Sequence, residues 1–229
     1  MTGSPVPWTE WLLDLVLPQR CVSCASPGAI VCVDCRAALM RLEPPLCERC
    51  GAPTAWPVAR CSECAGRRLA FRSARAAVTY TGAARAVVRA WKEGGLRPLA
   101  AHAAELVAEV VPRPAADVIT YIPPDGDRSL RRGHHPAERL ARELAWCWDI
   151  ESAPLLARSR SVAQQTGLRL AERRRNVRGA FVGATARPGH VVLVDDVYTT
   201  GATVAAAASA LAAVGAATVQ VVTFARAVR

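Results

Sequence analysis

The sequence predicts an α/β protein, a parallel sheet with flanking helices, preceded by a small cysteine-rich module. Three observations predict it. Eight of the nine cysteines fall in pairs before residue 65. Short β-branched runs then alternate with helical runs, which is typical of a parallel sheet with helices on both faces. Finally, the apolar run 191–194 leads directly into two aspartates and a small, hydroxyl-rich loop. We assign residues 1–70 to the module and residues 71–229 to the α/β domain.

The paired cysteines predict zinc binding. They form four Cys-x-x-Cys pairs: Cys21/Cys24, Cys32/Cys35, Cys47/Cys50 and Cys61/Cys64. Each pair places two thiolates on one tight turn, and two pairs complete a tetrahedral Zn²⁺ site. The module therefore has ligands for one or two ions. Adjacent pairing of the turns is the simplest arrangement, but interleaved pairing is common in zinc modules. The alternative is a redox or disulfide framework.

The predicted zinc is structural. A catalytic zinc keeps an open coordination position and usually has histidine ligands, and no histidine lies in residues 1–70. A module that folds only with its metal is the better interpretation. The ninth cysteine, Cys147, lies in a helical run between two tryptophans, and we expect it to be a buried apolar residue.

No segment has the pattern of a secretory signal or a membrane span. Residues 8–16 recur at helical spacing but include acidic residues and follow no basic region, so we expect an amphipathic helix docked on its own domain. A membrane anchor is the alternative. The long apolar run 202–225 is interrupted by Gly215 and Gln220, which favours a helix, a turn and a strand. We expect a cytoplasmic protein.

In the α/β domain we expect strands to alternate with helices along the chain. The predicted elements are a strand over 70–80, helices over 83–91 and 99–110, a strand over 118–122, a helix over 136–148, short strands from 155 and over 181–183, a strand over 190–196, a helix over 202–214 and a strand over 218–224. Pro112, Pro123 and Pro124 mark the ends of elements in this order.

Composition points to an anionic partner. The 229 residues are 52% hydrophobic, enough for a sizeable core, and the formal net charge is +10. A strongly basic chain attracts anions, and both pyrophosphate and nucleic acid fit.

The junction after residue 194 predicts a ligand site. Asp195 and Asp196 follow the buried run, and a helix follows the loop. Ligands of open α/β sheets bind at the carboxyl ends of strands, and a helix N-terminus attracts anions. The adjacent carboxylates suit the two hydroxyls of a ribose or a hydrated Mg²⁺. The loop residues that can offer hydroxyls and backbone N–H groups to a phosphate are Thr199, Thr200, Gly201, Ala202 and Thr203. The alternative is a buried strand that ends in a solvated turn.

Two basic segments are candidates for further anion contacts. Arg128, Arg131 and Arg132 follow the strand over 118–122, where they could bind pyrophosphate or be ordinary solvated charges. Arginines also crowd residues 158–178, which could contact DNA phosphates or form a solvated helix face. Few aromatic residues interleave with these arginines, so the stacking platform of a dedicated single-strand binder is missing there.

The sequence does not decide the role of two adjacent histidines. His134 and His135 could act as an acid/base pair, contact phosphate, or begin a helix without any chemistry.

In their order, these motifs resemble a known family. The segment DDVYTTGAT resembles the phosphoribosyl pyrophosphate (PRPP) motif of type I phosphoribosyltransferases. Together with the four cysteine pairs, the Tyr80/Gly82 start with Lys92, the Arg131-Arg132-Gly133 loop and the segment RSRSVAQQTGLRLAERRRNVRGAF, it resembles the ComF family, known for a role in natural competence. The likeness spans nearly the whole chain. One departure is that His134 and His135 stand where the family often has Phe and Asn.

The resemblance implies a site and a function. It implies that Asp195 and Asp196 are the catalytic acids of an Mg²⁺–PRPP site and that the Thr199–Thr203 loop holds the 5′-phosphate. The residues implied at the pyrophosphate and in the closing loop are Arg128, Arg132, Gln165, Arg173 and Asn176. It also implies a link to incoming single-stranded DNA or to competence proteins.

Two functions from different classes follow. The first is a phosphoribosyltransferase that moves ribose 5-phosphate from PRPP to an unidentified acceptor. The second is a non-catalytic protein of transformation that senses PRPP or handles single-stranded DNA. Fold alone does not decide between them.

Overall fold

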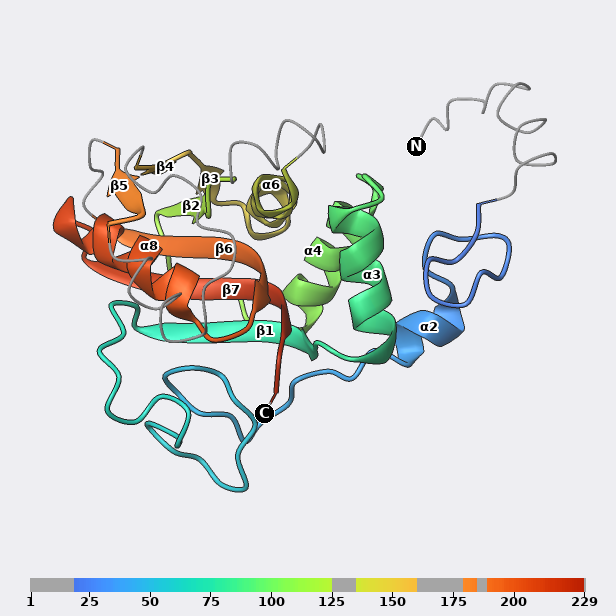
Figure 1. The fold of residues 1–229 in the computed structure, drawn as a ribbon, viewed down its shortest axis with the longest axis horizontal. Coiled ribbons are helices and arrows are strands. Elements are labelled where there is room, and N and C mark those ends of the chain that lie inside the picture. Colours follow the sequence, from blue (N-terminus) through green and yellow to red (C-terminus); the bar gives the residue numbers. More distant parts are fainter. Residues whose placement is uncertain (1–18, 125–134, 160–178, 185–188, 229) are drawn as a thin grey trace, which may run out of the picture.

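A parallel five-stranded sheet forms the centre of the molecule (Figure 1). The computed structural model describes residues 19–124, 135–159, 179–184 and 189–228. The strand order is β1-β7-β6-β2-β3, and every neighbouring pair in it is parallel. The bounds are β1 Ser73–Thr79, β2 Val118–Tyr121, β3 Glu151–Ser152, β6 His190–Tyr198 and β7 Thr218–Arg226. The predicted α/β class is confirmed.

Three helices cover one face of this sheet. They are α3 Gly82–Lys92, α4 Leu99–Val110 and α6 Pro136–Trp148, each within a residue of its predicted bounds. In α3, the buried residues Ala84, Val87, Val88 and Trp91 recur at the spacing of one helix face. They pack with α4, α6 and the sheet in a continuous apolar cluster. The spacing of apolar residues at the 3.6-residue period of a helix therefore predicted the bounds of these helices correctly.

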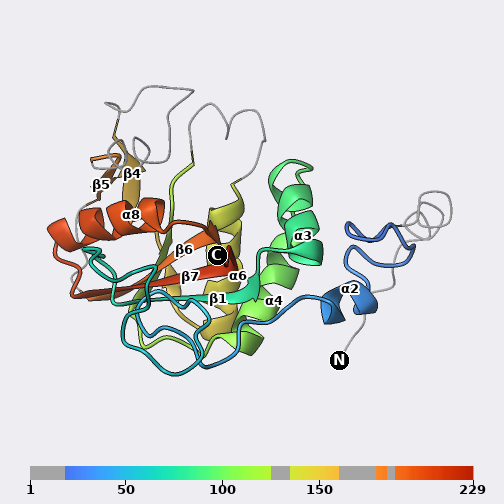
Figure 2. The same cartoon turned by 60° about the horizontal axis from the view of Figure 1, so that its bottom comes forward.

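The opposite face is covered by a different set of elements (Figures 1 and 2). Helix α8 Ala202–Ala213 packs there, together with the strands β4 Leu156–Arg158 and β5 Phe181–Gly183. These two strands pair antiparallel in a small sheet of their own. The alternation of elements predicted them as strands but did not show that they leave the parallel sheet. Strand β3, only two residues long, and the short helix α2 Val33–Ala37 were not predicted.

The cysteine-rich segment straddles the edge strand β1. Val22, Ile30 and Val31 pack against the cluster of α3 and α4, whereas Cys47, Cys50 and Cys64 lie in the cluster on the α8 face. Between them, the backbone pairs with the outer side of β1: Leu42 donates to Ala77, Thr79 to Met40 and Ala74 to Arg49. These bonds cover an edge that would otherwise present free backbone groups.

Two further findings concern expectations from the sequence. Cys147 is partly exposed, so the expected full burial is wrong. Among the described residues, none of the helices has the length and apolar character needed to cross a membrane. The predicted helix at residues 8–16 lies outside the described residues.

Candidate functional site

The two adjacent aspartates lie at the carboxyl end of the central strand β6. The sequence placed the end of this strand at residue 196, but pairing with β7 continues to Tyr198, so the aspartates lie within the strand. Asp196 is 4% exposed, and its Oδ2 lies 2.6 Å from the ammonium nitrogen of Lys92 at the end of α3. Because β2 neighbours β6, the loop after Tyr121 begins at the same edge of the sheet, as predicted.

Burial makes the two aspartates unequal. It raises the pKa of Asp195 to about 7, and the nearby charge of Asp196 raises this pKa further, while Lys92 opposes both effects. Two close carboxylates seldom both ionise without a cation. Asp196 pairs with Lys92, whereas the raised pKa of Asp195 is one that a bound cation would lower. The two aspartates of this edge are therefore unequal.

His135 lies at the same edge. It occupies the N-cap position of α6, its ring packs edge-on against Tyr121 at 5.4 Å between centroids, and its Nδ1 lies 3.5 Å from Oε2 of Glu138. Burial lowers the pKa of His135, although the negative charges of Glu138 and Asp196 act in the opposite direction. The imidazole is therefore mainly neutral at pH 7. Sequence reasoning left its role open, and the structure places it within electrostatic reach of Asp196.

The Thr199–Thr203 loop joins β6 to α8. Gly201 precedes the helix in a left-handed conformation, with φ of 70°, and as a glycine it offers no side chain to cap the helix. The Ala202 N–H donates to Oγ1 of Thr200 at 3.3 Å. A Cβ on Gly201 would overlap the Tyr198 hydroxyl, so only glycine fits here. The loop therefore presents hydroxyls and the N–H groups of the first helical turn, which together suit an anion.

The eight paired cysteines form two clusters. The first cysteine cluster is Cys21, Cys24, Cys32 and Cys35, and the second cysteine cluster is Cys47, Cys50, Cys61 and Cys64. Adjacent pairs combine, which settles the alternative that the sequence left open.

Both clusters fit zinc. In the second cluster, sulfur atoms lie 3.6 Å apart for Cys47 and Cys64 and 3.4 Å apart for Cys50 and Cys61. In the first cluster, Cys24 and Cys32 are 3.6 Å apart. Four sulfurs at about 2.3 Å from a tetrahedral Zn²⁺ would be separated by about 3.8 Å. The arrangement thus needs little change to accept an ion.

The other predicted site residues lie outside the described residues. They are Arg128, Arg132, Gln165, Arg173 and Asn176. The chain that leads into their two segments is described, however. Nε of Arg158 donates to the carbonyl of Pro123 at 3.1 Å, and its guanidinium lies 5.1 Å from the centroid of the Phe181 ring. The points at which the two segments begin are therefore held together, near the carboxyl end of β2.

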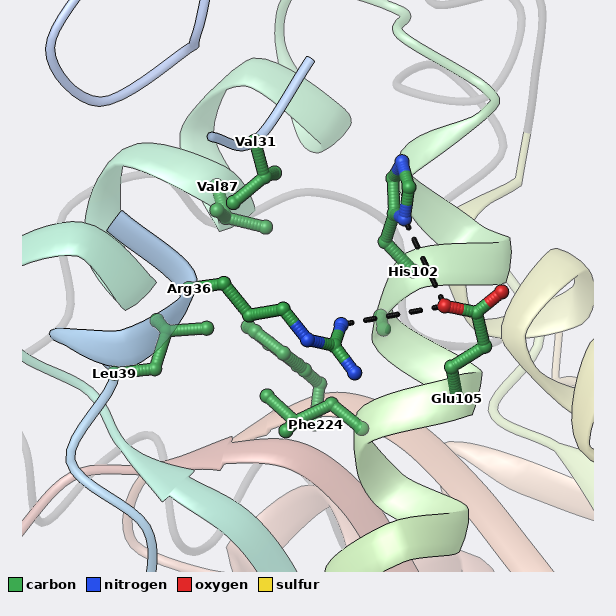
Figure 3. A pocket seen from close by; sticks show the side chains of 9 residues that line it. Val31, Arg36, Leu39, Val87, His102, Glu105 and Phe224 are labelled. Carbon is green, nitrogen blue, oxygen red and sulfur yellow. Dashed lines mark ion pairs between the residues drawn. The ribbon is translucent and has the colours of Figure 1, made fainter. Parts of the chain in front are cut away.

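A cavity of about 240 Å³ lies away from the aspartates (Figure 3). Arg36 and Leu39, which follow the first cysteine cluster in the sequence, line one side of it, and His102 and Glu105 of α4 line another. Oε2 of Glu105 pairs with both Arg36, at 4.0 Å, and His102, at 3.8 Å. The cavity is thus part of the contact between the module and the α3–α4 face.

Comparison with known proteins assigns both parts of the chain. Residues 12–65 match the double zinc ribbon domain, and residues 130–228 match the phosphoribosyl transferase domain. DNA utilization protein YhgH of Salmonella typhi is 33% identical over 223 residues, which cover 90% of this chain and 96% of that protein. YhgH of Escherichia coli O157:H7 is 30% identical over 227 residues, with the same coverage.

A solved structure is also similar to part of the chain. It is the glutamine PRPP amidotransferase from B. subtilis complexed with ADP and GMP, 24% identical with a TM-score of 0.39. The likeness covers 54% of this chain, which spans 25% of that chain.

Fold, cysteine clusters and matched domains define a double zinc ribbon joined to a phosphoribosyltransferase domain. Within that class, the chain belongs to the ComF family, together with the YhgH proteins.

Proposed function

We propose that the protein binds Mg²⁺–PRPP and transfers ribose 5-phosphate to an acceptor that is not yet identified. The Thr199–Thr203 loop would hold the 5′-phosphate through its hydroxyls and the N–H groups of α8. Asp195 and Asp196 would orient the two ribose hydroxyls. Residues of the two segments outside the described residues, Arg128 and Arg132 in one and Gln165, Arg173 and Asn176 in the other, would contact the pyrophosphate and close over it.

The proposed reaction makes specific demands on these residues. Pyrophosphate leaves C1 of the ribose with the bonding electrons, and a nucleophile of the acceptor forms the new bond to C1. Positive charge develops on the ribose as the bond breaks, so carboxylates held close to the sugar would stabilise it. Holding the phosphate at the other end of the sugar keeps C1 in place.

The acidic pair also fits a cation that arrives with the substrate. Carboxylate oxygens are preferred ligands of Mg²⁺, and a positive charge near Asp195 would lower its raised pKa. Asp195 and Asp196, directly or through water, are the residues that would hold the ion. When bound, Mg²⁺ neutralises charge on the leaving pyrophosphate.

One observation carries this proposal. The partly buried Asp195, the buried Asp196 and a helix N-terminus that begins at a glycine lie within one strand–loop–helix junction. A solvated turn would need neither the burial of Asp196 nor a position, residue 201, that has no room for a side chain. A phosphorylated sugar needs both features, because its hydroxyls and its phosphate are bound at once.

Calorimetric titration of PRPP into zinc-loaded protein tests the proposal. We expect binding that depends on Mg²⁺ and that is weakened at least tenfold in the Asp195→Asn/Asp196→Asn variant. Asp149→Asn is the matched control, because Asp149 is exposed at the far end of α6 in a left-handed conformation that Asn tolerates. Absence of PRPP binding by folded wild-type protein would overturn the proposal.

A second candidate function has its own support. The relatives are named DNA utilization proteins, and the chain carries a net charge of +10. These observations favour a protein that senses PRPP, or handles single-stranded DNA with other competence proteins, without turnover. Affinity for single-stranded DNA would then be high and would fall steeply with salt. PRPP consumption in the presence of candidate acceptors distinguishes this function from the transferase.

We further propose that residues 1–70 and 71–229 are the two domains and that the protein works in the cytoplasm. Free cysteine clusters suited to zinc support this compartment, because thiolates persist where glutathione keeps them reduced. Two zinc ions per chain are expected.

A further inference from the structure

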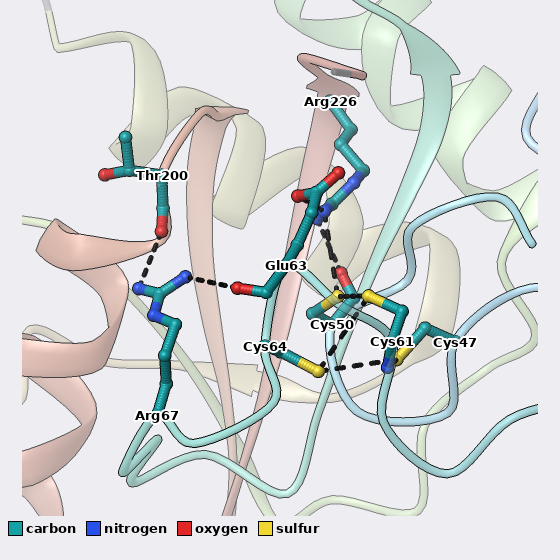
Figure 4. A network of polar contacts seen from close by, with 8 residues as sticks. All are labelled: Cys47, Cys50, Cys61, Glu63, Cys64, Arg67, Thr200 and Arg226. Atoms are coloured by element: carbon teal, nitrogen blue, oxygen red, sulfur yellow. Dashed lines mark hydrogen bonds and ion pairs between the residues drawn. The ribbon is translucent and has the colours of Figure 1, made fainter.

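The second cysteine cluster lies beside the Thr199–Thr203 loop and is joined to it by two routes of contacts (Figure 4). The first route runs through Arg67. Its backbone N–H donates to the carbonyl of Cys64 at 3.2 Å, so its position depends on that turn. Its guanidinium donates to the carbonyl of Thr200 at 2.8 Å. One residue therefore connects a predicted zinc ligand with the middle of the loop.

The second route runs through Arg226 at the end of β7. This arginine is 1% exposed and donates to the carbonyl of Cys50 at 2.6 Å. It also pairs at 2.7 Å with Glu63, which lies between two cysteines of the cluster. Its guanidinium lies 4.5 Å from the ring centroid of Tyr198. The Tyr198 hydroxyl in turn occupies the space in which a side chain at residue 201 would lie.

These contacts fix the direction of one peptide group of the loop. The carbonyl of Thr200 points toward Arg67. In a trans peptide the C=O and the following N–H point in opposite directions, so the N–H of Gly201 points away from Arg67. The Tyr198 ring, held by Arg226, supports the same residue from a second direction. The loop thus takes its shape partly from the second cysteine cluster and not from its own sequence alone.

The first cysteine cluster has no such connection. Its neighbours Val22, Ile30 and Val31 pack with α3 and α4 on the other face of the sheet. Among the described residues, no hydrogen bond or ion pair links it to the Thr199–Thr203 loop. The two clusters should therefore differ in their effect on the loop.

We propose that the second cysteine cluster, loaded with zinc, holds the Thr199–Thr203 loop in its binding conformation, with Arg67 and Arg226 as positioning residues. Affinity for the ligand's phosphate then depends on the second cluster and not on the first. The identity of that ligand as PRPP rests on the proposed function, whereas the positioning of the loop does not.

Hydrogen exchange of the backbone amides of residues 199–205 tests the positioning directly. In Arg67→Ala we expect exchange about tenfold faster, which corresponds to the loss of one hydrogen bond from a charged donor. Arg68→Ala removes the same charge from an exposed neighbouring residue and should leave exchange unchanged. Arg67→Lys retains a donor and should restore protection in part. Zinc content, measured alongside, should equal that of the wild type in all three variants.

A second pair of variants tests which cluster matters. Cys64→Ser in the second cluster should release one zinc ion and raise exchange in residues 199–205. Cys24→Ser in the first cluster should also release one zinc ion and leave that exchange unchanged. If Cys64→Ser fails to fold, Arg67→Ala carries the test, because it keeps all eight paired cysteines.

The outcomes separate this proposal from the proposed function. Equal exchange in Arg67→Ala and Arg68→Ala would overturn the positioning role, whatever PRPP does. Faster exchange in Arg67→Ala, with weaker PRPP binding, supports both. Faster exchange with no PRPP binding by the wild type supports the positioning role and overturns PRPP as the ligand.

Discussion

Lys92 shows how a single side chain completes the acidic edge. It is the only lysine in a chain whose other basic residues are arginines. Its compact ammonium group reaches Asp196 from the end of α3. A lysine places a point charge where an arginine would impose a planar fork. Apart from its place among the motifs of the family resemblance, its singular occurrence is the sequence signal that marks it, because nothing in the local pattern of α3 separates it from a surface cation.

The raised pKa of Asp195 makes stability depend on pH. Its pKa is 3.8 ordinarily and about 7 in the folded protein, so between these values the folded state binds a proton that the unfolded state has lost. Stability from this group therefore falls as pH rises from about 4 to about 7, by at most about 1.4 kcal/mol per pH unit.

Urea unfolding between pH 5.5 and 8 measures this effect in the absence of ligand. We expect Asp195→Asn to decline less with pH than the wild type and to be the more stable of the two at pH 8. Parallel pH profiles for the two proteins would contradict the prediction.

Gly201 should tolerate no side chain. Gly201→Ala introduces left-handed strain of about 1 kcal/mol and an overlap with Tyr198 that adds about 1–3 kcal/mol. Gly66→Ala is the matched control, because Gly66 has φ of 69° and open space around it. Urea unfolding should show a larger loss for Gly201→Ala than for Gly66→Ala. Equal losses would mean that the loop moves aside at no cost.

Residues that are adjacent in sequence were the predictable part of the site. Asp195, Asp196 and the loop share one strand–loop–helix junction, so local pattern sufficed to find them. Arg67 and Arg226 were not predicted to link this junction to the second cysteine cluster, because the contact of Arg67 with Thr200 spans 133 residues and that of Arg226 with Glu63 spans 163. No local pattern encodes a contact over that distance. From the sequence alone, neither arginine can be told from a solvent-exposed charge.

At the scale of elements, the long helices and most strands were predictable, and the two-residue strand β3 was not. Helices α4 and α6 have the predicted bounds because their apolar period is sustained over three turns and prolines mark their limits. Strand β3 has two residues, too few for any period. Strand β6 continues past its aspartates because its pairing with β7 persists there, a property of the partner strand rather than of its own residues.

The small β4–β5 sheet is joined to the end of β2, close to the points at which the two basic segments begin. Arg158 joins this sheet to the end of β2 through Pro123. Arg158→Ala should leave the parallel sheet intact but loosen the point at which the two segments begin, and weaken PRPP binding about tenfold. Arg89→Ala, which removes an exposed ion pair on α3, is the control. Calorimetric titration of both variants measures the difference, and equal affinities would contradict it.

At the scale of the whole molecule, the two cysteine clusters support opposite faces of one sheet. Metal analysis of the purified protein should find two zinc ions per chain. Chelation should lower the melting temperature markedly, because Cys47, Cys50 and Cys64 contribute directly to the apolar cluster beneath α8. Cys24→Ser, at an exposed position of the first cluster, should lower it much less. A single ion per chain would contradict the fit of both clusters to zinc.

The pairing of Glu63 with Arg226 has a consequence for the order of events during synthesis. The cysteine-rich segment leaves the ribosome first, but the strand that carries its buried partner is made 163 residues later. Closing so long a separation is slow. Until then, the α8-facing side of the second cysteine cluster has no sheet to cover it. A nascent chain that stops before residue 218 should therefore expose this apolar surface and depend on chaperones, even with its metal already bound.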